Sequence, residues 1–536
     1  MRKITPSLNW SMDKIAASAL FDVDFYLEKY PDIQISGLDP FEHYCLHGWR
    51  EGRDPSPFFS TNFYLQRYQD VAVAGLNPLN HYALQGVKEG REALPLEPAG
   101  ESAREVVLGA RSARSRSLGW VPVVDIGSPL DKKRLRDIFL STFAKNTGNA
   151  IVSLSHDQYI RSVGGVQAAI AIEEGVLTAA GWTYIHLCPA SPLPLLADAK
   201  PDAATLLVLT LNGRREGVVR LSDILAVLPL AAAETQKTLS LIVHHLMGFS
   251  ADAVISISKI CKARTPILWV HDFFSLCVNP FLLRNDIAFC NAPAVDSSAC
   301  MICCEGVDRR THVEQVRYLF DELRPVVLAP SETALNLWKA KGSLTYSKAM
   351  VLPLARVELG LPSSDEGRRP LRVAHLGAPA SHKGWPTFKK LVERHAEDAR
   401  YEFFRLGVGK TGLKRLTEVS VEAGPGNVDA MIDATRAHGI DIVINWSSCF
   451  ETFSFITLEA LAAGAFVIAR KDAGNVWPAV VAAGSERGIA VSTEIELRAL
   501  FVTGEILERA ATTLTRGRLL RSRGTADLFL KEAPLV

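Results

Sequence analysis

The stretch Glu451–Gly464, ETFSFITLEALAAG, decides the fold of this chain. It lies between two apolar runs, residues 440–445 and 466–469, that have the length and composition of buried parallel strands. A strand, a helix and a second strand in this order form one repeating unit of a parallel sheet.

The sequence predicts that the helix begins near Ser454 and runs to Ala463, with Gly464 as its stop. Glu451 then lies in the loop before the helix, and Glu459 lies inside it. A helix N-terminus offers free backbone N–H groups to phosphate, and a carboxylate accepts hydrogen bonds from vicinal sugar hydroxyls. Together these groups fit a nucleotide diphosphate sugar. The residues alone also allow that Glu451 only caps the helix and that Glu459 is merely polar.

The alternation of strands and helices occurs in two successive series. The first has runs predicted as buried parallel strands at 150–154, 206–211, 267–270 and 326–329, with a helix at 166–180. The second has runs at 372–376, 401–406, 440–445 and 466–469. Two such series predict an α/β protein with two Rossmann-like domains that face each other across a cleft and bind ligands at the carboxyl ends of their strands.

The N-terminal region contains an internal repeat with an offset of 38 residues. The motif Gly37-Leu38-x-Pro40-x2-His43-Tyr44 recurs as Gly75-Leu76-x-Pro78-x2-His81-Tyr82. Such a period predicts a mostly helical unit that buries one face against its neighbour. His43 and His81 are either ligands or, as we expect, histidines that hydrogen-bond within their own repeats.

These features divide the chain into five segments. They are two 38-residue repeats at 1–95, a linker and lead-in helix at 96–149, an acceptor-side Rossmann-like domain at 150–360, a nucleotide-sugar-binding Rossmann-like domain at 361–510, and a crossover helix and tail at 511–536.

Composition excludes several classes of protein. The 536 residues carry a formal net charge of +1, with 22% charged and 48% hydrophobic residues, so no global field favours nucleic acid. No apolar run approaches the roughly 20 residues that span a bilayer, and Met1–Asn9 is followed by polar residues rather than a signal sequence. We therefore expect a cytoplasmic protein, with peripheral attachment at the inner face of the plasma membrane left open.

The segment Glu451–Gly464 resembles the E-x7-E motif of retaining glycosyltransferases of family 4, which have the GT-B fold. The resemblance extends over residues 150–498. It implies that Glu451 touches the transferred sugar and that Glu459 holds the ribose. It also implies that the phosphates meet the backbone at Ser454, Phe455 and Ile456.

Other motifs carry the same resemblance. Gly164-Gly165, after the first strand, looks like the glycine-rich loop of the family, and Lys383-Gly384 looks like its Lys-Gly, whose lysine meets the diphosphate. His271 follows the strand-like run 267–270, where many members of the family have a histidine beside the transferred sugar. We predict Glu451, His271 and Lys383 as catalytic residues. In Pro330-Ser331-Glu332, Ser331 is predicted only to cap a helix.

One position departs from the family. The usual Gly-Arg before the Lys-Gly supplies a second cation for the diphosphate, but here Gly377 is followed by Ala378. Lys383 is then expected to act with His382 or with Arg405, although Arg405 is more readily interpreted as making an ordinary helix-dipole or surface contact. No metal ion is required where the helix N-terminus and Lys383 neutralise the phosphates.

Five of the nine cysteines cluster between Cys277 and Cys304. Cys277, Cys290, Cys300 and Cys303 have the spacing C-x12-C-x9-C-x2-C, which suits a structural zinc site with only one Cys-x-x-Cys knuckle. Buried reduced thiols and a disulfide are the other interpretations.

The sequence thus predicts a glycosyltransferase that moves a hexose or deoxyhexose, with retention, from a nucleotide diphosphate sugar to a glycan or lipid-linked acceptor. The N-terminal repeat resembles modules found beside glycosyltransferases of bacterial polysaccharide synthesis, which implies that pathway and a docking role in protein or peripheral membrane contact. An inactive sugar-nucleotide-binding or scaffold protein and a nucleotide-sugar epimerase of GT-B fold are the alternatives. Neither the donor base and sugar nor the acceptor follows from the sequence.

Overall fold

The computed structural model describes residues 17–95, 127–162, 164–191, 193–197, 205–286, 288–301, 303–362, 370–422, 427–510 and 515–530. By internal contacts the chain divides into two units. One unit contains the N-terminal repeats together with residues 282–310. The other contains residues 121–281 and 311–536, and therefore both predicted Rossmann-like domains. The predicted linker from residue 96 to the start of the lead-in helix lies mostly outside the described residues.

The N-terminal repeat is a repeat of structure as well as of sequence. The first copy consists of α2 (Val23–Lys29), α3 (Pro31–Ser36), α4 (Pro40–His43) and the short π-helix η1 (Tyr44–Gly48). The second consists of α5 (Thr61–Arg67), α6 (Gln69–Val73), α7 (Pro78–His81) and η2 (Tyr82–Gly86). The two copies share one hydrophobic core, so neither is complete alone.

The paired histidines of the repeats hold their own copies together, as expected. Tyr26 Oη lies 3.0 Å from His43 Nδ1, and Tyr64 Oη lies 3.0 Å from His81 Nδ1. Both tyrosines are fully buried, and burial lowers the pKa of both histidines. A neutral imidazole that satisfies a buried hydroxyl is a packing element rather than a metal ligand.

The first Rossmann-like domain contains one sheet of eight strands in the order β10-β9-β6-β5-β1-β2-β3-β4. The strands are β1 (Ala150–Leu154), β2 (Thr183–Pro189), β3 (Leu206–Leu211), β4 (Arg214–Arg220), β5 (Leu239–Val243), β6 (Ile267–Trp269), β9 (Val326–Ala329) and β10 (Lys348–Val351). The helices are α9 (Lys132–Lys145), α10 (Gly165–Ala179), α11 (Leu221–Glu234), α12 (Ala251–Ile260), α14 (Gly306–Leu323) and α15 (Glu332–Lys341).

The prediction that residues 206–211 form a parallel strand is wrong. This strand, β3, runs antiparallel to both β2 and β4. The cause is the dipeptide Asn212-Gly213, whose φ angles of 45° and 75° make a two-residue hairpin turn between β3 and β4. The other three predicted strands of this series pair in parallel.

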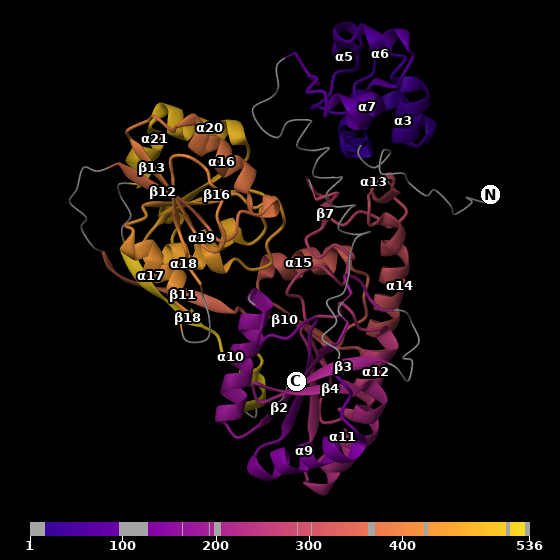
Figure 1. Cartoon of the computed structure of the whole chain (residues 1–536), viewed down its shortest axis with the longest axis vertical. Coiled ribbons are helices and arrows are strands. Elements are labelled where there is room, and N and C mark those ends of the chain that lie inside the picture. The colour runs from indigo at the N-terminus through magenta and orange to yellow at the C-terminus, as the bar shows by residue number, and fades with distance from the viewer. Residues whose placement is uncertain are drawn as a thin grey trace. The chain divides into compact units, whose positions relative to one another are not determined.

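The second Rossmann-like domain contains a six-stranded, wholly parallel sheet in the order β14-β13-β12-β15-β16-β17. The strands are β12 (Leu371–Leu376), β13 (Tyr401–Leu406), β14 (Leu416–Val419), β15 (Ile442–Asn445), β16 (Phe466–Arg470) and β17 (Gly488–Val491). The helices α16 (Trp385–Arg394), α20 (Glu494–Thr503) and α21 (Glu505–Ala510) cover one face of the sheet. The helices α17 (Ala430–Ala437), α18 (Phe455–Ala463) and α19 (Val476–Ala483) cover the other (Figure 1).

The segment expected to form one crossover helix after residue 510 instead forms a strand and a short helix. Strand β18 (Thr515–Arg521) pairs antiparallel with β11 (Ala355–Pro362), beside α18. Helix α22 (Ala526–Leu530) then joins the hydrophobic core of the first domain through Ala526 and Phe529. The alternating burial of β18 reflects its position on the edge of a two-stranded ribbon rather than a helical face.

The helix that the sequence placed after Glu451 is confirmed at both ends. Ser454 is the N-cap of α18, and its side chain accepts a hydrogen bond from the backbone N–H of Thr457. Gly464 ends the helix with φ of 97°, a conformation that favours glycine. Ser331 likewise caps α15 through the N–H of Ala334, as expected.

The predicted fold class is therefore confirmed: this is an α/β protein of GT-B type, with two Rossmann-like domains and a small helical repeat module before them. In each domain the strand order reverses direction beside a central strand, between β1 and β5 in the first and between β12 and β15 in the second. Such reversal points are where parallel sheets bind ligands. None of the helices in the described residues is both long and apolar enough to cross a bilayer.

Candidate functional site

The two predicted donor residues Lys383 and Glu451 come together at the reversal point of the second sheet. Lys383 follows β12, and Glu451 follows β15. Lys383 Nζ lies 2.7 Å from Glu451 Oε1, and the Ser447 hydroxyl donates to the same carboxylate oxygen at 2.9 Å. Burial opposes the charge of Lys383, but the attraction of Glu451 outweighs it and holds the pKa of Lys383 above its usual value. The site thus contains an intact ion pair.

Gly384 explains why the lysine before it reaches the next loop. Gly384 has a φ of 80°, and a Cβ atom at this position would overlap the carbonyl oxygen of Trp446. The loop after β12 therefore packs directly on the loop after β15. The Ser448 N–H donates to the His382 carbonyl at 3.0 Å, and Ser447 Oγ lies 3.0 Å from the same carbonyl oxygen, so the two loops are held together.

The backbone of Glu451 is fixed by the segment that follows β16. Glu451 accepts a hydrogen bond from the Asn475 N–H at 2.8 Å, and its own N–H donates to the Ala473 carbonyl. Gly474, with φ of 64°, lets this segment approach, because a Cβ there would lie 2.5 Å from the Glu451 carbonyl oxygen. A carboxylate held by three loops is rigid enough to position a ligand.

The N-terminal turn of α18 leaves two amides for a ligand. The Ser454 hydroxyl is used by the cap and also accepts from Asn445 Nδ2 at 3.0 Å, so this side chain is structural. Within the described chain, the N–H groups of Phe455 and Ile456 have no hydrogen-bond acceptor. The predicted backbone donors are therefore present at Phe455 and Ile456.

Glu459 lies one helical turn further into α18 and is partly buried. Burial raises its pKa to about 7, the nearby Arg521 opposes the shift, and Asp429 adds to it. Since Glu459 accepts no hydrogen bond from the described residues, its carboxyl group is available for hydroxyl groups. Its protonation changes near neutral pH.

The missing arginine at Ala378 is not replaced by Arg405. The Arg405 side chain is fully buried, and its guanidinium donates to the carbonyls of Gly377, Val408 and Gly409. It also pairs with Glu418 at 3.3 Å. Arg405 therefore braces the loops at the end of β13, so the expected helix-dipole or surface contact is wrong. The ring of His382 is stacked on Phe281, with centroids 4.8 Å apart.

Of the glycine pair of the first domain, Gly165 lies against α18. Gly165 is the first residue of α10, and a Cβ built there would be 3.9 Å from the ring of Phe455. Gly164 has an extended backbone with φ of 174°, which any residue can adopt, and the atoms nearest to a Cβ there belong to the Gln167 side chain. The structure thus brings Gly165 next to the predicted donor helix.

His271 also contacts the loop that contains Glu451. The Thr452 hydroxyl donates to the His271 carbonyl at 2.5 Å, and the Ser331 hydroxyl donates to the Thr452 carbonyl at 2.7 Å. Burial, with a smaller effect of the nearby His244, lowers the pKa of His271 well below its usual value. The His271 ring is therefore neutral at pH 7.

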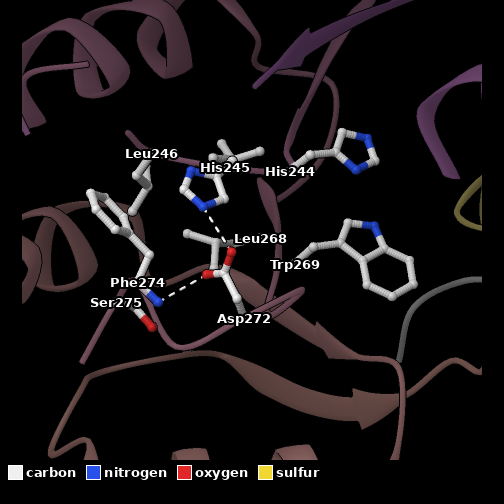
Figure 2. A pocket seen from close by; sticks show the side chains of 9 residues that line it. His244, His245, Leu246, Leu268, Trp269, Asp272, Phe274 and Ser275 are labelled. Carbon is white, nitrogen blue, oxygen red and sulfur yellow. Dashed lines mark hydrogen bonds and ion pairs between the residues drawn. The ribbon is translucent and has the colours of Figure 1, made fainter. Parts of the chain in front are cut away.

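Sequence reasoning missed a group of polar residues beside His271. A small pocket in the first domain is lined by Val243, His244, His245, Leu246, Leu268, Trp269, Asp272, Phe274 and Ser275 (Figure 2). His244 and His245 follow β5, on one side of the reversal point of the first sheet. The signal was an apolar run, Leu239–Val243, that ends in two histidines.

The cysteines are all free thiols, so the structure contains no disulfide among them. Within the unit that includes residues 282–310, the ligand atoms of Cys303, Cys304 and Glu305 lie within 4.8 Å of one another. Cys300 instead accepts a hydrogen bond from Arg309 at 2.6 Å. Zinc bound by Cys277, Cys290, Cys300 and Cys303 remains a prediction, and the adjacent trio offers a different ligand set.

Comparisons with known proteins place no family name on the chain. No family model matches the sequence, and no curated protein matches it significantly. The similar solved structures include Anabaena HepE in complex with UDP-glucose, which is 13% identical over 68% of this chain and 92% of that chain, with a TM-score of 0.41.

Two other similar structures are described as glycosyltransferases. WaaG, involved in lipopolysaccharide biosynthesis, is 12% identical over 71% of this chain and 99% of that chain, with a TM-score of 0.41. A glycosyltransferase from Rickettsia africae is 12% identical over 68% of this chain and 91% of that chain, also with a TM-score of 0.41. Similarity at this level assigns neither an activity nor a substrate to the chain.

Proposed function

We propose that the protein is a retaining glycosyltransferase that moves a hexose or deoxyhexose from a nucleotide diphosphate sugar to a glycan or lipid-linked acceptor. The observation that supports this most strongly is the convergence of Lys383, Glu451 and the first turn of α18 at the reversal point of the second sheet. A cation, a carboxylate and free amides at one such point match the parts of a sugar diphosphate.

In this proposal the diphosphate lies at the N–H groups of Phe455 and Ile456, with Lys383 as its cation. Glu451 accepts hydrogen bonds from the transferred sugar, and Glu459 accepts them from the ribose. Lys383 and the helix N-terminus stabilise the negative charge that develops on the leaving diphosphate. Donor binding requires Lys383 to turn from Glu451 toward the phosphates.

Retention would follow from a front-face displacement, in which the acceptor oxygen attacks on the face from which the diphosphate leaves. We place the acceptor beside the first domain, near Gly164, Gly165 and His271. A role in bacterial surface polysaccharide synthesis, with the repeat module as a docking element at other proteins or a membrane surface, is part of the same proposal.

The proposal is tested by a calorimetric screen of nucleotide sugars against the full chain, followed by assays of transfer and donor hydrolysis. We expect one donor class to bind and to raise thermal stability by mass action. Lys383→Ala and Glu451→Ala should abolish turnover. Failure to bind any nucleotide sugar would sink the enzyme interpretation.

One observation favours a second candidate, a sugar-nucleotide-binding protein without turnover. Ala378 replaces the usual arginine and Arg405 is engaged elsewhere, so among the described residues Lys383 alone of the predicted cations contacts the site carboxylate. Binding of a nucleotide sugar without transfer or hydrolysis would support this candidate.

A further inference from the structure

Two adjacent histidines at the end of β5 point in opposite directions (Figure 2). His245 faces the pocket, where its Nε2 lies 2.9 Å from Asp272 and its Nδ1 accepts the Met247 N–H at 3.1 Å. Both nitrogens of His245 are therefore occupied by fixed partners. His244 also contributes to the lining of the pocket, but its ring lies near Trp269, where it has different partners.

His244 connects a buried carboxylate to His271. Its Nε2 lies 3.3 Å from Glu173 Oε1, and its Nδ1 lies 3.1 Å from His271 Nε2. The planes of the two imidazoles differ by only 11°. The side chains of His244 and Glu173 are each only 1% exposed, so the line Glu173, His244, His271 is sealed from water over most of its length.

Glu173 is anchored as an ionised group within α10, the helix that begins at Gly165. The Tyr184 hydroxyl donates to Glu173 Oε1 at 2.8 Å. Burial works to raise the pKa of Glu173, but the positive charge of a protonated His244, together with hydrogen bonds from His244, Thr525 and Tyr184, outweighs burial and holds this pKa below its usual value. A buried carboxylate in this state stabilises a positive charge on the adjacent imidazole.

The outer end of the line is open. His271 Nδ1 has no hydrogen-bond partner among the described residues, whereas both nitrogens of His244 are engaged. When His244 is neutral it donates to Glu173 and accepts from His271 Nε2–H, which leaves His271 Nδ1 as an acceptor. When His244 carries a second proton, the hydrogen bond between the two rings reverses and His271 Nδ1 carries the hydrogen.

We propose that Glu173, His244 and His271 form a proton relay that takes the proton of the acceptor hydroxyl during glycosyl transfer. In this relay His271 touches the substrate, and Glu173 and His244 are positioning residues that act through it. The inference rests on the proposed transferase function and deepens it, because it adds a second destination for a proton that would otherwise pass to the leaving diphosphate.

Bonds, electrons and protons balance in this step. The acceptor oxygen forms its bond to the anomeric carbon while the bond from that carbon to the diphosphate breaks, and the electron pair leaves with the diphosphate. The hydroxyl proton passes to His271 Nδ1, and the His271 Nε2 proton passes to His244 Nδ1. The positive charge then resides on His244 beside ionised Glu173. After the product leaves, the extra proton returns through His271 to solvent.

The test is the pH profile of kcat/KM for the full chain and for Glu173→Gln, a variant that keeps the hydrogen-bond acceptor but not the charge. The relay must start without the extra proton, so wild-type activity falls on the acid side of the profile, where the relay already holds that proton. Without the charge of Glu173 the protonated relay is less stable. We therefore expect kcat to fall by about 100-fold with KM unchanged, and the acid limb to move at least about one pH unit lower.

Three titratable groups near His271, namely His156, His245 and Asp272, could contribute to that limb. The matched control is therefore His245→Gln, which changes the neighbouring position but not the relay and should leave the acid limb in place. A limb that moves in His245→Gln and not in Glu173→Gln would overturn the relay. If Glu173→Gln does not fold, His244→Asn, which keeps a polar atom near the Nδ1 position, replaces it and should remove the limb.

A measurement without substrate separates this inference from the proposed function. In ¹⁵N spectra of the imidazoles, the relay predicts that His244 and His271 titrate together and that their midpoint falls in Glu173→Gln. Independent titration of the two rings, or an unchanged midpoint, would contradict the relay even if the chain transfers sugar. If the two rings titrate together but the chain binds no sugar nucleotide, the coupling of His244 and His271 would stand. The proposed proton transfer from an acceptor would then be overturned.

Discussion

The ammonium group of Lys383 and the carboxylate of Glu451 lie 2.7 Å apart, although 68 positions separate the two residues in the chain. The carboxylate side chain is 10% exposed and the lysine side chain 33%. In the absence of a donor, each group therefore neutralises the other. If a diphosphate binds here as proposed, Lys383 would exchange one anionic partner, the Glu451 carboxylate, for another.

We expect Lys383→Met to destabilise the second domain by about 1–2 kcal/mol, because it leaves the buried Glu451 carboxylate with Ser447 alone. Glu451→Gln should cost less, since the amide still accepts hydrogen bonds from both partners. Hydrogen exchange of peptides from β15 and α18 measures the difference at pH 7. Equal losses in the two variants would show that the pair contributes little to folding.

Arg405→Lys should separate a structural arginine from a phosphate-binding one. Lysine keeps the charge but lacks the planar fork that reaches the carbonyls of Gly377, Val408 and Gly409. We expect a loss of about 2–3 kcal/mol in the stability of the second domain, with nucleotide-sugar affinity unchanged wherever the variant is folded. Reduced affinity with full stability would assign the second cation to Arg405 after all.

Glu459→Gln should change how stability depends on pH. The pKa of Glu459 is raised to about 7 in the folded chain. Ionisation of Glu459 therefore costs the wild type no free energy of unfolding at pH values below the pKa of this group in the unfolded chain, and the free energy of unfolding falls as the pH rises from there toward 7. Glutamine does not ionise and avoids this loss. The variant should therefore be more stable than wild type at pH 8, by on the order of 1 kcal/mol, and no more stable at pH 4. Thermal unfolding at the two pH values measures this, with Glu402→Gln as an exposed control.

The two repeats should respond equally to matched substitutions. A methyl group on Gly48 would overlap the hydroxyl of Tyr26, and one on Gly86 would overlap that of Tyr64. We expect Gly48→Ala and Gly86→Ala each to cost about 1–3 kcal/mol of stability in the module. Gly75→Ala, which meets nothing within 4 Å, tests for the cost of the left-handed backbone alone. Hydrogen exchange of residues 17–95 is the readout, and clearly unequal losses would contradict equivalent packing.

Metal analysis of the purified full chain tests the zinc prediction and its ligand set. We expect one zinc ion per chain, lost in Cys303→Ser, because Cys303 belongs both to the predicted four cysteines and to the trio with Cys304 and Glu305. Cys277→Ser separates the two sets, since only the four-cysteine site requires it. Loss of zinc in that variant would support the four-cysteine site, retained zinc would support the trio, and a chain without zinc would end the idea.

The second domain was predictable because its strands are buried on both faces and because local sequence marks both ends of helix α18. Ser454 and Gly464 mark the ends of α18 through local chemistry, a side-chain cap and a left-handed turn, which do not depend on the rest of the fold. Glu451 and Lys383 were found in the same way, by their places after strands. The ion pair between them could not be predicted, because it depends on how two loops pack at Gly384 and no local sequence pattern indicates this packing.

The first domain was harder to predict because its decisive features depend on contacts between segments that are far apart in the sequence. Strand β3 is as apolar as a parallel strand, and only the turn residues Asn212-Gly213 reveal that it is half of a hairpin. Glu173 was overlooked because a glutamate in a helix is usually exposed. Its burial arises from Tyr184 and His244, which meet it only after β2 and β5 have joined the sheet.

The segment that ends in β18 and α22 has a consequence for the order of synthesis. The described residues of this segment complete the ribbon beside α18 and also supply Ala526, Phe529 and the Thr525 hydroxyl to the first domain. A nascent chain that has emerged only as far as residue 510 therefore lacks part of the interior of both domains. Until the last turn of α22 leaves the ribosome, the apolar surfaces it covers are exposed, and a chaperone that binds such surfaces would have its longest access there.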